Sequence, residues 1–308
     1  MSTPTPVDVP GDVVDWVTDI FRQCNIRISE KLTKIPNCPE ESLDMTWVEH
    51  FSQYASPLTL GSSWTIKVET HFLGGLRHFF HWEIADIGIL LFIRRGGRVT
   101  NSKVALLQSK RLYPTNNLVR EEHRIDYEIG FARLADPEDM ETPIGNEVEY
   151  EFNEDCRFGA LEAGSDQVRT IADYEKQENL SVYYQLYGPW SIPIVQRIPL
   201  SSFAQPATEL MYGVRVVPAN QVHRVLAAKS RGHKPTLREL GTVGGNDDFK
   251  YGWPLEYFAG ELFLKCQEGS PFETIQEERI QSLFNRRSGA IYAAIAITAE
   301  EPVDQGAA

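Results

Sequence analysis

Apolar positions near the start of the chain recur at the spacing of a helix. Over 12–34 they fall three and four residues apart, which predicts an amphipathic helix. The apolar set is Val13, Val17, Ile20, Phe21 and Cys24. A second helix is predicted over 43–54, after a break that contains two prolines. The Pro-rich lead 1–11 and the tail 300–308 lack such a pattern, and we expect both to be disordered.

After the second predicted helix the pattern changes from helical to extended. Three apolar runs, at 64–73, 84–94 and 103–112, predict three strands. The pair Gly96-Gly97 separates the last two runs, and such a pair is typical of a tight turn between antiparallel strands. We therefore expect the second and third strands to form a hairpin.

The middle of the chain alternates helix and strand patterns. A helix is predicted over 118–133, where it would cover the hairpin, and another over 166–179. The second of these leads directly into a short apolar and aromatic run at 180–187, which predicts a strand. This order of elements indicates a mixed α/β fold.

The C-terminal third is less regular. Strands are predicted at 212–217 and 290–298, with a helix near 253–266 between them. Ser270 is followed by a proline and, three residues on, by a glutamate, which is the composition of a helix start. We expect a helix to begin there.

The overall composition is that of an ordinary folded protein, with 308 residues, 42% apolar and 24% charged. This length permits one large domain or two small ones, and we expect a core over 12–200 with 201–299 packed on it as an elaboration. No apolar run is long enough to cross a bilayer, and the N-terminus is not built like a signal peptide. We therefore expect a cytoplasmic protein with no membrane partner, whose four scattered cysteines are reduced and serve packing.

The formal charge of −13 argues against a nucleic-acid partner, because phosphate binding relies on lysine and arginine. The charge is nevertheless segregated along the chain. The region 87–111 holds six basic residues and no acid, and 221–238 holds five basic residues and no acid. In contrast, 136–155 holds nine acids and no base. A charge run is often only a solvated surface, so its neighbourhood decides its meaning.

Three polar residues in the predicted hairpin form a candidate reactive centre, which we call the trio: Asp86, Gln108 and Lys110. Asp86 lies near the start of one strand, and Gln108 and Lys110 lie near the end of its partner, Gln108 coming 22 residues after Asp86. Because side chains alternate faces along a strand, Gln108 and Lys110 should share a face while Ser109 points away. A tight hairpin then lets Asp86 converge on that pair.

The trio suits phosphodiester hydrolysis, which needs a cation, an activated water and stabilisation of the leaving oxygen. Asp86 is a hard oxygen ligand of the kind that Mg²⁺ prefers. Gln108 would offer its side-chain carbonyl oxygen, and Ser109 its backbone carbonyl. Lys110 could orient the attacking water or stabilise developing charge. A structural alternative is a partly buried ion pair of Asp86 with Lys110, satisfied by Gln108 and holding no metal.

An aspartate, a hairpin and then Q-x-K resemble the PD-(D/E)XK superfamily of restriction-endonuclease-like proteins in its QxK variant. The chain is similar in this respect to Mrr-type enzymes and to nuclease domains of bacterial anti-phage effectors, over about residues 43–190. The resemblance implies an αβββαβ core, metal binding by Asp86, Gln108 in the place of a second acid, and Lys110 as the catalytic lysine. The sequence departs from the commonest pattern in that glutamine and in having no proline before Asp86.

Members of that superfamily often add an acid from a helix, which makes Glu49 a candidate metal ligand. Glu69 on the first predicted strand is a second candidate, and Glu83 competes for the same role. His71, together with the nearby histidines at 78 and 81, does not have the spacing of a transition-metal site. The glycines near 241–245 do not form a phosphate loop, because no Lys-Ser/Thr follows them.

With the trio as a phosphate site, the basic run around it acquires a purpose. Residues in it could bind phosphates near the scissile bond, a contact that positions DNA without reading its sequence. They are Arg94, Arg95, Arg98, Lys103 and Arg111.

The expected function is thus a Mg²⁺- or Mn²⁺-dependent nuclease acting on DNA, by analogy an effector of anti-phage or anti-plasmid defence. Because the chain is acidic overall, we expect a partner subunit or a homo-oligomer to supply further basic surface. The alternative is an inactive nuclease-fold subunit that binds DNA or a partner protein. A small-molecule enzyme built on the glycine-rich loop has no supporting motif.

Overall fold

The structure is a computed structural model of the chain. It describes residues 8–73, 84–115, 148–198, 212–241, 249–284 and 291–302. The helix predicted over 118–133, Glu83, the histidines at 78 and 81, and most of the glycine-rich loop lie outside these residues. Within them, no helix has the length and apolar character needed to cross a membrane.

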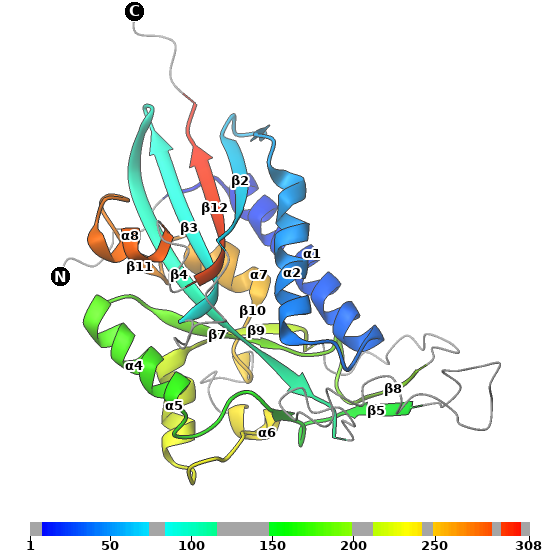
Figure 1. The fold of residues 1–308 in the computed structure, drawn as a ribbon. Coiled ribbons are helices and arrows are strands. Elements are labelled where there is room, and N and C mark those ends of the chain that lie inside the picture. Colours follow the sequence, from blue (N-terminus) through cyan, green and yellow to red (C-terminus); the bar gives the residue numbers. More distant parts are fainter. Residues whose placement is uncertain are drawn as a thin grey trace, which may run out of the picture.

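Both predicted N-terminal helices are present. Helix α1 spans Gly11–Lys34, and α2 spans Glu40–Phe51 and continues as a single 3-10 turn, η1, over Ser52–Tyr54. The two helices lie side by side along one face of the sheet (Figure 1). Aromatic rings join them, with the centroids of Phe21 and Trp47 5.8 Å apart. The apolar stripe that predicted α1 is therefore buried against α2 and the sheet.

A large mixed sheet forms the centre of the molecule, and with the surrounding helices it confirms the α/β class. Among the described residues it contains ten strands, with the main order β1-β2-β12-β3-β4-β7-β9-β10 and with β6 and β11 paired to β4. The strands are β1 Leu58–Thr59, β2 Thr65–Phe72, β3 Ala85–Arg95, β4 Arg98–Tyr113, β6 Arg157–Phe158, β7 Val182–Tyr187, β9 Val214–Pro218, β10 Trp253–Pro254, β11 Ser270–Pro271 and β12 Ile291–Glu300. A separate ribbon pairs β5 Val148–Phe152 with β8 Ile194–Ile198.

The predicted hairpin is confirmed. Strands β3 and β4 are antiparallel, and their turn contains Gly96 and Gly97, both with positive φ. Positive φ favours glycine, which explains the pair at this turn. After β4, the chain passes through α4, Asp166–Glu178, and returns as β7, which runs parallel to β4. The helix-then-strand unit predicted from the sequence is therefore also present.

The C-terminal third contributes strands to the sheet itself, where the sequence suggested an elaboration packed on a core. Strand β12 lies between β2 and β3, antiparallel to the first and parallel to the second. The helix expected at Ser270 is absent, since Ser270 and Pro271 form β11 against β4. The Ser270 hydroxyl accepts a hydrogen bond from the backbone N–H of Ser181 at 2.7 Å, so it does not cap a helix. The helix α8 begins only at Glu278.

The remaining helices are short. They are α5 Ala219–Ala227, α6 Leu237–Leu240, α7 Leu255–Tyr257, the π-helical η4 Phe258–Phe263 and α8 Glu278–Phe284. Helices α7 and η4 pack against α1, α5 packs against β7 and β9, and α8 packs against β12 (Figure 1).

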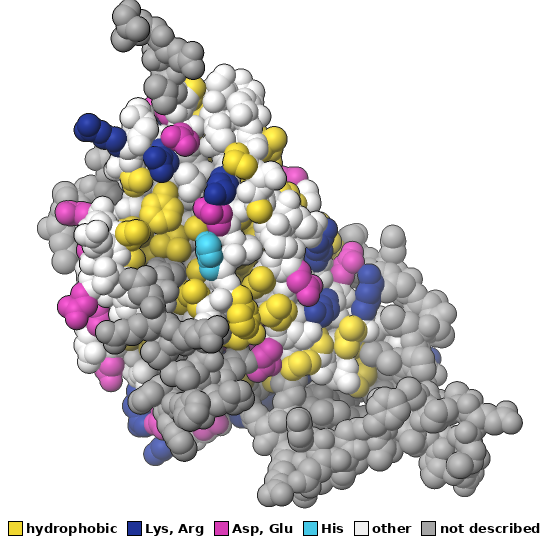
Figure 2. All heavy atoms as spheres, turned by 45° about the horizontal axis from the view of Figure 1, so that its top comes forward, with side chains coloured by type: hydrophobic (Ala, Val, Ile, Leu, Met, Phe, Trp, Pro, Cys, Tyr) yellow, Lys and Arg dark blue, Asp and Glu magenta, His cyan; other side chains and the backbone are white. Residues whose placement is uncertain are grey.

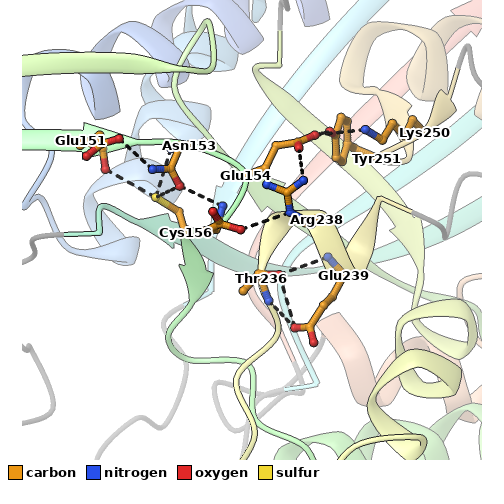
Figure 3. Close-up of polar contacts among 10 residues, drawn as sticks. Glu151, Asn153, Glu154, Cys156, Thr236, Arg238, Glu239, Lys250 and Tyr251 are labelled. Atoms are coloured by element: carbon orange, nitrogen blue, oxygen red, sulfur yellow. Dashed lines mark hydrogen bonds and ion pairs between the residues drawn. The ribbon is translucent and has the colours of Figure 1, made fainter.

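A cluster of ion pairs holds the segment that adjoins the end of β4. Strand β6 pairs with the last two residues of β4, and the segment just before β6 is fixed through Glu154. Its carboxylate lies 3.0 Å from Arg238 of α6 and 3.1 Å from the ammonium of Lys250, and it accepts the hydroxyl of Tyr251 (Figure 3). Segments far apart in the sequence therefore meet where β4 ends.

Candidate active site at the start of β3 and the end of β4

The structure brings the trio together. Asp86 is the second residue of β3, and the register that pairs Ile87 with Leu107 carries Asp86 opposite Gln108. The Gln108 side-chain amide donates a hydrogen bond to Asp86 Oδ2 at 2.5 Å. All three residues of the trio are buried, at no more than 3% exposure. Polar groups buried so deeply require partners, and their partners define the site.

Carboxylates replace a neighbouring strand at the end of β4. β4 continues past the point where β3 begins, so on that edge its next backbone N–H groups have no strand partner among the described residues, while β7 pairs along the other edge. Asp86 Oδ2 accepts the N–H of Ser109 at 2.7 Å, and Glu40 Oε2 accepts the N–H of Arg111 at 2.9 Å. The first turn of α2 thereby supplies an acid to the site. Both carboxylates satisfy buried backbone donors that would otherwise be left unpaired.

Lys110 and Glu40 form the ion pair of the site. The Lys110 ammonium lies 3.2 Å from Glu40 Oε1. Burial opposes the charged form of Lys110, but Glu40, Asp86 and Asp44 outweigh it and raise the lysine pKa. For Glu40, burial raises the pKa to about 7, with Lys110 lowering it and Asp86 raising it. Three carboxyl groups thus act on one ammonium, and their mutual repulsion adds to the effect of burial on the pKa of Glu40.

A second polar group lies on α2, one turn beyond Glu40. Asp44 Oδ1 accepts the hydroxyl of Ser109 at 2.5 Å and that of Tyr187 at 2.7 Å. Gln185, next to them on β7, donates from its side-chain amide to both hydroxyl oxygens at 2.6 Å. Burial, followed by the charges of Asp86 and Glu40, holds the pKa of Asp44 well above its usual value.

The two additional ligands suggested by the sequence lie elsewhere. Glu49 is on α2, as the resemblance implied for an acid, but its side chain is exposed. Glu69 lies on β2, which β12 separates from β3, and it pairs with Lys67 at 2.8 Å. His71 lies on β2 as well. None of these side chains has a contact with the trio among the described residues.

The acids that do reach the site are Glu40 and Asp44, and the sequence carried a signal for them. With Trp47 and Phe51 they form one stripe of α2, at successive intervals of four, three and four residues. Trp47 and Phe51 are fully buried, so the stripe faces the core. Acids that continue an apolar stripe are buried acids. The predicted helix began three residues too late to include Glu40.

The basic residues of the hairpin tip are far from the trio. Arg94 is eight strand residues from Asp86, which is roughly 25 Å along the sheet. Arg94 pairs with Glu300 at 3.5 Å and Arg95 with Glu301 at 3.7 Å, so both are engaged by the last residues of β12 and its continuation. Arg98 is exposed at the turn.

The other two candidate phosphate-binding residues are buried. Lys103 donates to the backbone carbonyl of Glu268, and burial lowers its pKa. Arg111 donates to the carbonyl of Pro36 at 2.9 Å, and its guanidinium stacks over the Tyr113 ring at 4.0 Å. The structure therefore gathers neither the hairpin tip nor Lys103 around the trio, and Arg111, which follows Lys110, directs its guanidinium to Pro36 and Tyr113.

The donor set of the site suits a hard cation, although no group of three or more His, Cys, Asp or Glu side chains in the described ranges has the arrangement of a metal site. Gln108 Oε1 is buried with no hydrogen-bond partner among the described residues, and so is Asp44 Oδ2. Carboxylate and amide oxygens are the ligands that Mg²⁺ prefers. The orphaned Gln108 oxygen, beside the carboxylate of Asp86, therefore fits a divalent cation chemically.

No protein-family model matches the chain, and no match was found among curated proteins or solved structures. The geometry of the site therefore carries the functional proposal.

Proposed function

We propose that the chain is a metal-dependent nuclease that hydrolyses phosphodiester bonds of DNA, with Asp86, Gln108 and Lys110 at its centre. The observation that carries the proposal is the orphaned Gln108 Oε1. It lies buried in a cluster where three carboxyl groups face one ammonium. Burying an acceptor without a donor is costly, and a cation would relieve that cost together with the repulsion among the neighbouring carboxyl groups.

Each residue of the cluster has a distinct task in this proposal. Asp86, Gln108, the backbone carbonyl of Ser109 and Glu40 would hold Mg²⁺ or Mn²⁺. Such an ion would supply the charge that offsets negative charge developing on the phosphate. Lys110 would orient the attacking water or donate to a phosphate oxygen, because its ammonium lies at the same cluster.

The surface that binds DNA is proposed to be completed by a partner subunit or by a second copy of the chain. On the face shown in Figure 2, the Lys and Arg side chains of the described residues are interspersed with Asp and Glu and form no continuous patch. Phosphate binding depends on such a patch. By the resemblance to effector nucleases, the activity would belong to a defence system, which is an analogy of fold and motif alone.

The test of the proposal is divalent-ion-dependent degradation of plasmid DNA. We expect Lys110→Ala to abolish cleavage with Mg²⁺ and with Mn²⁺. Because this change leaves buried carboxylates unpaired, Asp86→Asn serves as a second variant that retains an oxygen for the Ser109 N–H. Lys67→Ala, at a half-buried lysine of β2 that lies away from the trio, is the matched control. Full activity in both site variants, each shown to be folded by circular dichroism, contradicts the mechanism.

A second candidate is an inactive nuclease-fold subunit that binds DNA or a partner protein. One observation favours this candidate. The carboxylates of Asp86 and Glu40, which would bind the ion in an enzyme, each already accept a backbone N–H of β4. A cluster committed to the sheet in this way can be purely structural. If DNA and RNA both stay intact with either ion, with and without a partner, while the chain binds DNA in a mobility-shift assay, this candidate replaces the enzyme.

A further inference from the structure

We propose that Asp44, Gln185 and Tyr187 are positioning residues, which fix Ser109 and through it the two trio side chains that flank it on β4. This inference rests on the proposed nuclease function. It assigns these three residues no contact with substrate or ion. They act by holding one residue of the strand from which the site is built.

The geometry converges on a single hydroxyl. Ser109 Oγ donates to Asp44 Oδ1 at 2.5 Å and accepts from Gln185 at 2.6 Å, and it lies 3.2 Å from the Tyr187 hydroxyl. The partners come from two elements, α2 and β7. All four side chains are buried, none more than 1% exposed. A serine held from two elements leaves its backbone little freedom.

The position of Ser109 makes this restraint matter for the site. Ser109 lies between Gln108 and Lys110 in the chain. It therefore shares one peptide bond with each of them. Its own N–H is also tied, to Asp86 at 2.7 Å. Restraining the backbone of Ser109 therefore also restrains the directions in which the side chains of Gln108 and Lys110 point. Partners that orient such groups typically change metal affinity or activity by 10- to 100-fold when removed.

Pairing of β4 with β7 does not depend on this network. Along the same pair of strands, Leu106 lies opposite Val182 and Leu107 opposite Tyr183. The polar group begins two positions later, where Ser109 lies opposite Gln185. Replacing a buried polar network by apolar side chains of similar size is often neutral for stability. The network thus occurs next to the trio, where orientation is at stake.

Three variants separate positioning from other roles. Tyr187→Phe removes one hydroxyl from the network. Asp44→Asn keeps the oxygen that accepts from Ser109 and Tyr187, and Asp44→Ala removes it. The matched control is Tyr212→Phe, because the buried Tyr212 hydroxyl has no hydrogen-bond partner among the described residues. Thermal melts establish which variants are folded.

We expect Tyr187→Phe to lower kcat by about 10- to 100-fold with KM nearly unchanged, and to weaken Mn²⁺ binding in titration calorimetry. Asp44→Asn should stay close to wild type in both measurements, Asp44→Ala should not, and Tyr212→Phe should be unaffected. Wild-type kcat and Mn²⁺ affinity in Tyr187→Phe overturn the inference. So does a complete loss of Mn²⁺ binding in folded Asp44→Asn, since Asp44 would then be a ligand. If Asp44→Ala does not fold, the other two variants decide.

Failure of the proposed function is recognised separately, in the wild-type protein. If it cuts neither DNA nor RNA and does not bind Mn²⁺, the nuclease proposal fails. Hydrogen exchange at the Ser109 amide then still tests the positioning. Faster exchange in Tyr187→Phe than in Tyr212→Phe supports it, and equal exchange in the two variants overturns it.

Discussion

The two ends of the β3–β4 hairpin carry similar residues in opposite physical settings. At the open end, Lys110 pairs with Glu40, with side chains 4% and 16% exposed. At the turn, Arg94 pairs with Glu300, with side chains 40% and 38% exposed. One ion pair is held in the protein interior, and the other is partly exposed to water. The basic run in the sequence includes both ends and does not distinguish them.

The two settings differ in how strongly each charge depends on its partner. Exposed ion pairs contribute little to stability because water and salt screen them. Replacing an arginine of the tip with another polar residue should therefore change the free energy of unfolding only slightly. Buried pairs are sensitive, because removing one partner leaves the other charge without compensation. In the proposed function the acid-rich cluster at the open end binds a cation, whereas Arg94 and Arg95 at the tip already pair with glutamates.

The largest effect is predicted for Glu40→Ala. It leaves the Lys110 ammonium buried without its nearest carboxylate and removes the acceptor of the Arg111 N–H. We expect a loss of about 3–5 kcal/mol in the free energy of unfolding, measured by urea denaturation. Glu49→Ala, an exposed acid on the same helix, is the control and should change stability by less than about 0.5 kcal/mol. Equal free energies of unfolding for Glu40→Ala and Glu49→Ala would show that the buried ion pair at the open end is no more sensitive than an exposed charge.

An intermediate effect is predicted in the middle of the hairpin, at Lys103. Burial lowers the pKa of this lysine, and the influence of Cys266 and Glu268 does not restore it. A lysine with a folded pKa below its unfolded value is least favourable at neutral pH, and the protein gains stability as pH rises towards the unfolded pKa. Lys103→Met removes this dependence, and we expect it to change stability at neutral pH by no more than about 1 kcal/mol.

The measurement is urea unfolding of both proteins at about pH 7 and about pH 9.5, within the range where the lysine titrates. The free energy of unfolding of the wild type should rise relative to that of Lys103→Met at the higher pH. A wild type that instead loses stability relative to the variant contradicts the direction of the pKa shift.

Local features of the fold were readable from the sequence, whereas long-range pairings were not. The apolar runs and the Gly96-Gly97 turn predicted β3 and β4 because a hairpin depends on neighbouring residues. The place of β12 between β2 and β3 depends on contacts between residues more than two hundred positions apart in the sequence. The sequence of β12 predicts a strand but does not indicate which strands it pairs with. Ser270 shows the same limit, since a favourable helix start was overridden by pairing with β4.

The candidate site was predictable in part for the same reason. Strand parity and the hairpin register brought Asp86 and Gln108 together, as the hydrogen bond between them shows. Predicting that Glu40 and Asp44 of α2 reach the site would have required knowing which side of that helix faces the sheet. Glu49 and Asp44 lie five residues apart on α2, yet one is exposed and the other buried. Only the stripe shared with Trp47 distinguished them.

The smallest effect is predicted at the hairpin turn, for Arg94→Ala. Its guanidinium pairs with Glu300 at 3.5 Å and donates to the carbonyl of Gly97 at 3.0 Å, in a setting where water can replace both partners. We expect the free energy of unfolding to fall by less than about 0.5 kcal/mol, and less still at high salt. Cleavage should be unaffected, because the pair is roughly 25 Å from Asp86. A tenfold loss of DNA binding in Arg94→Ala would instead make the tip a phosphate contact, and the two ends of the hairpin would then act on one substrate.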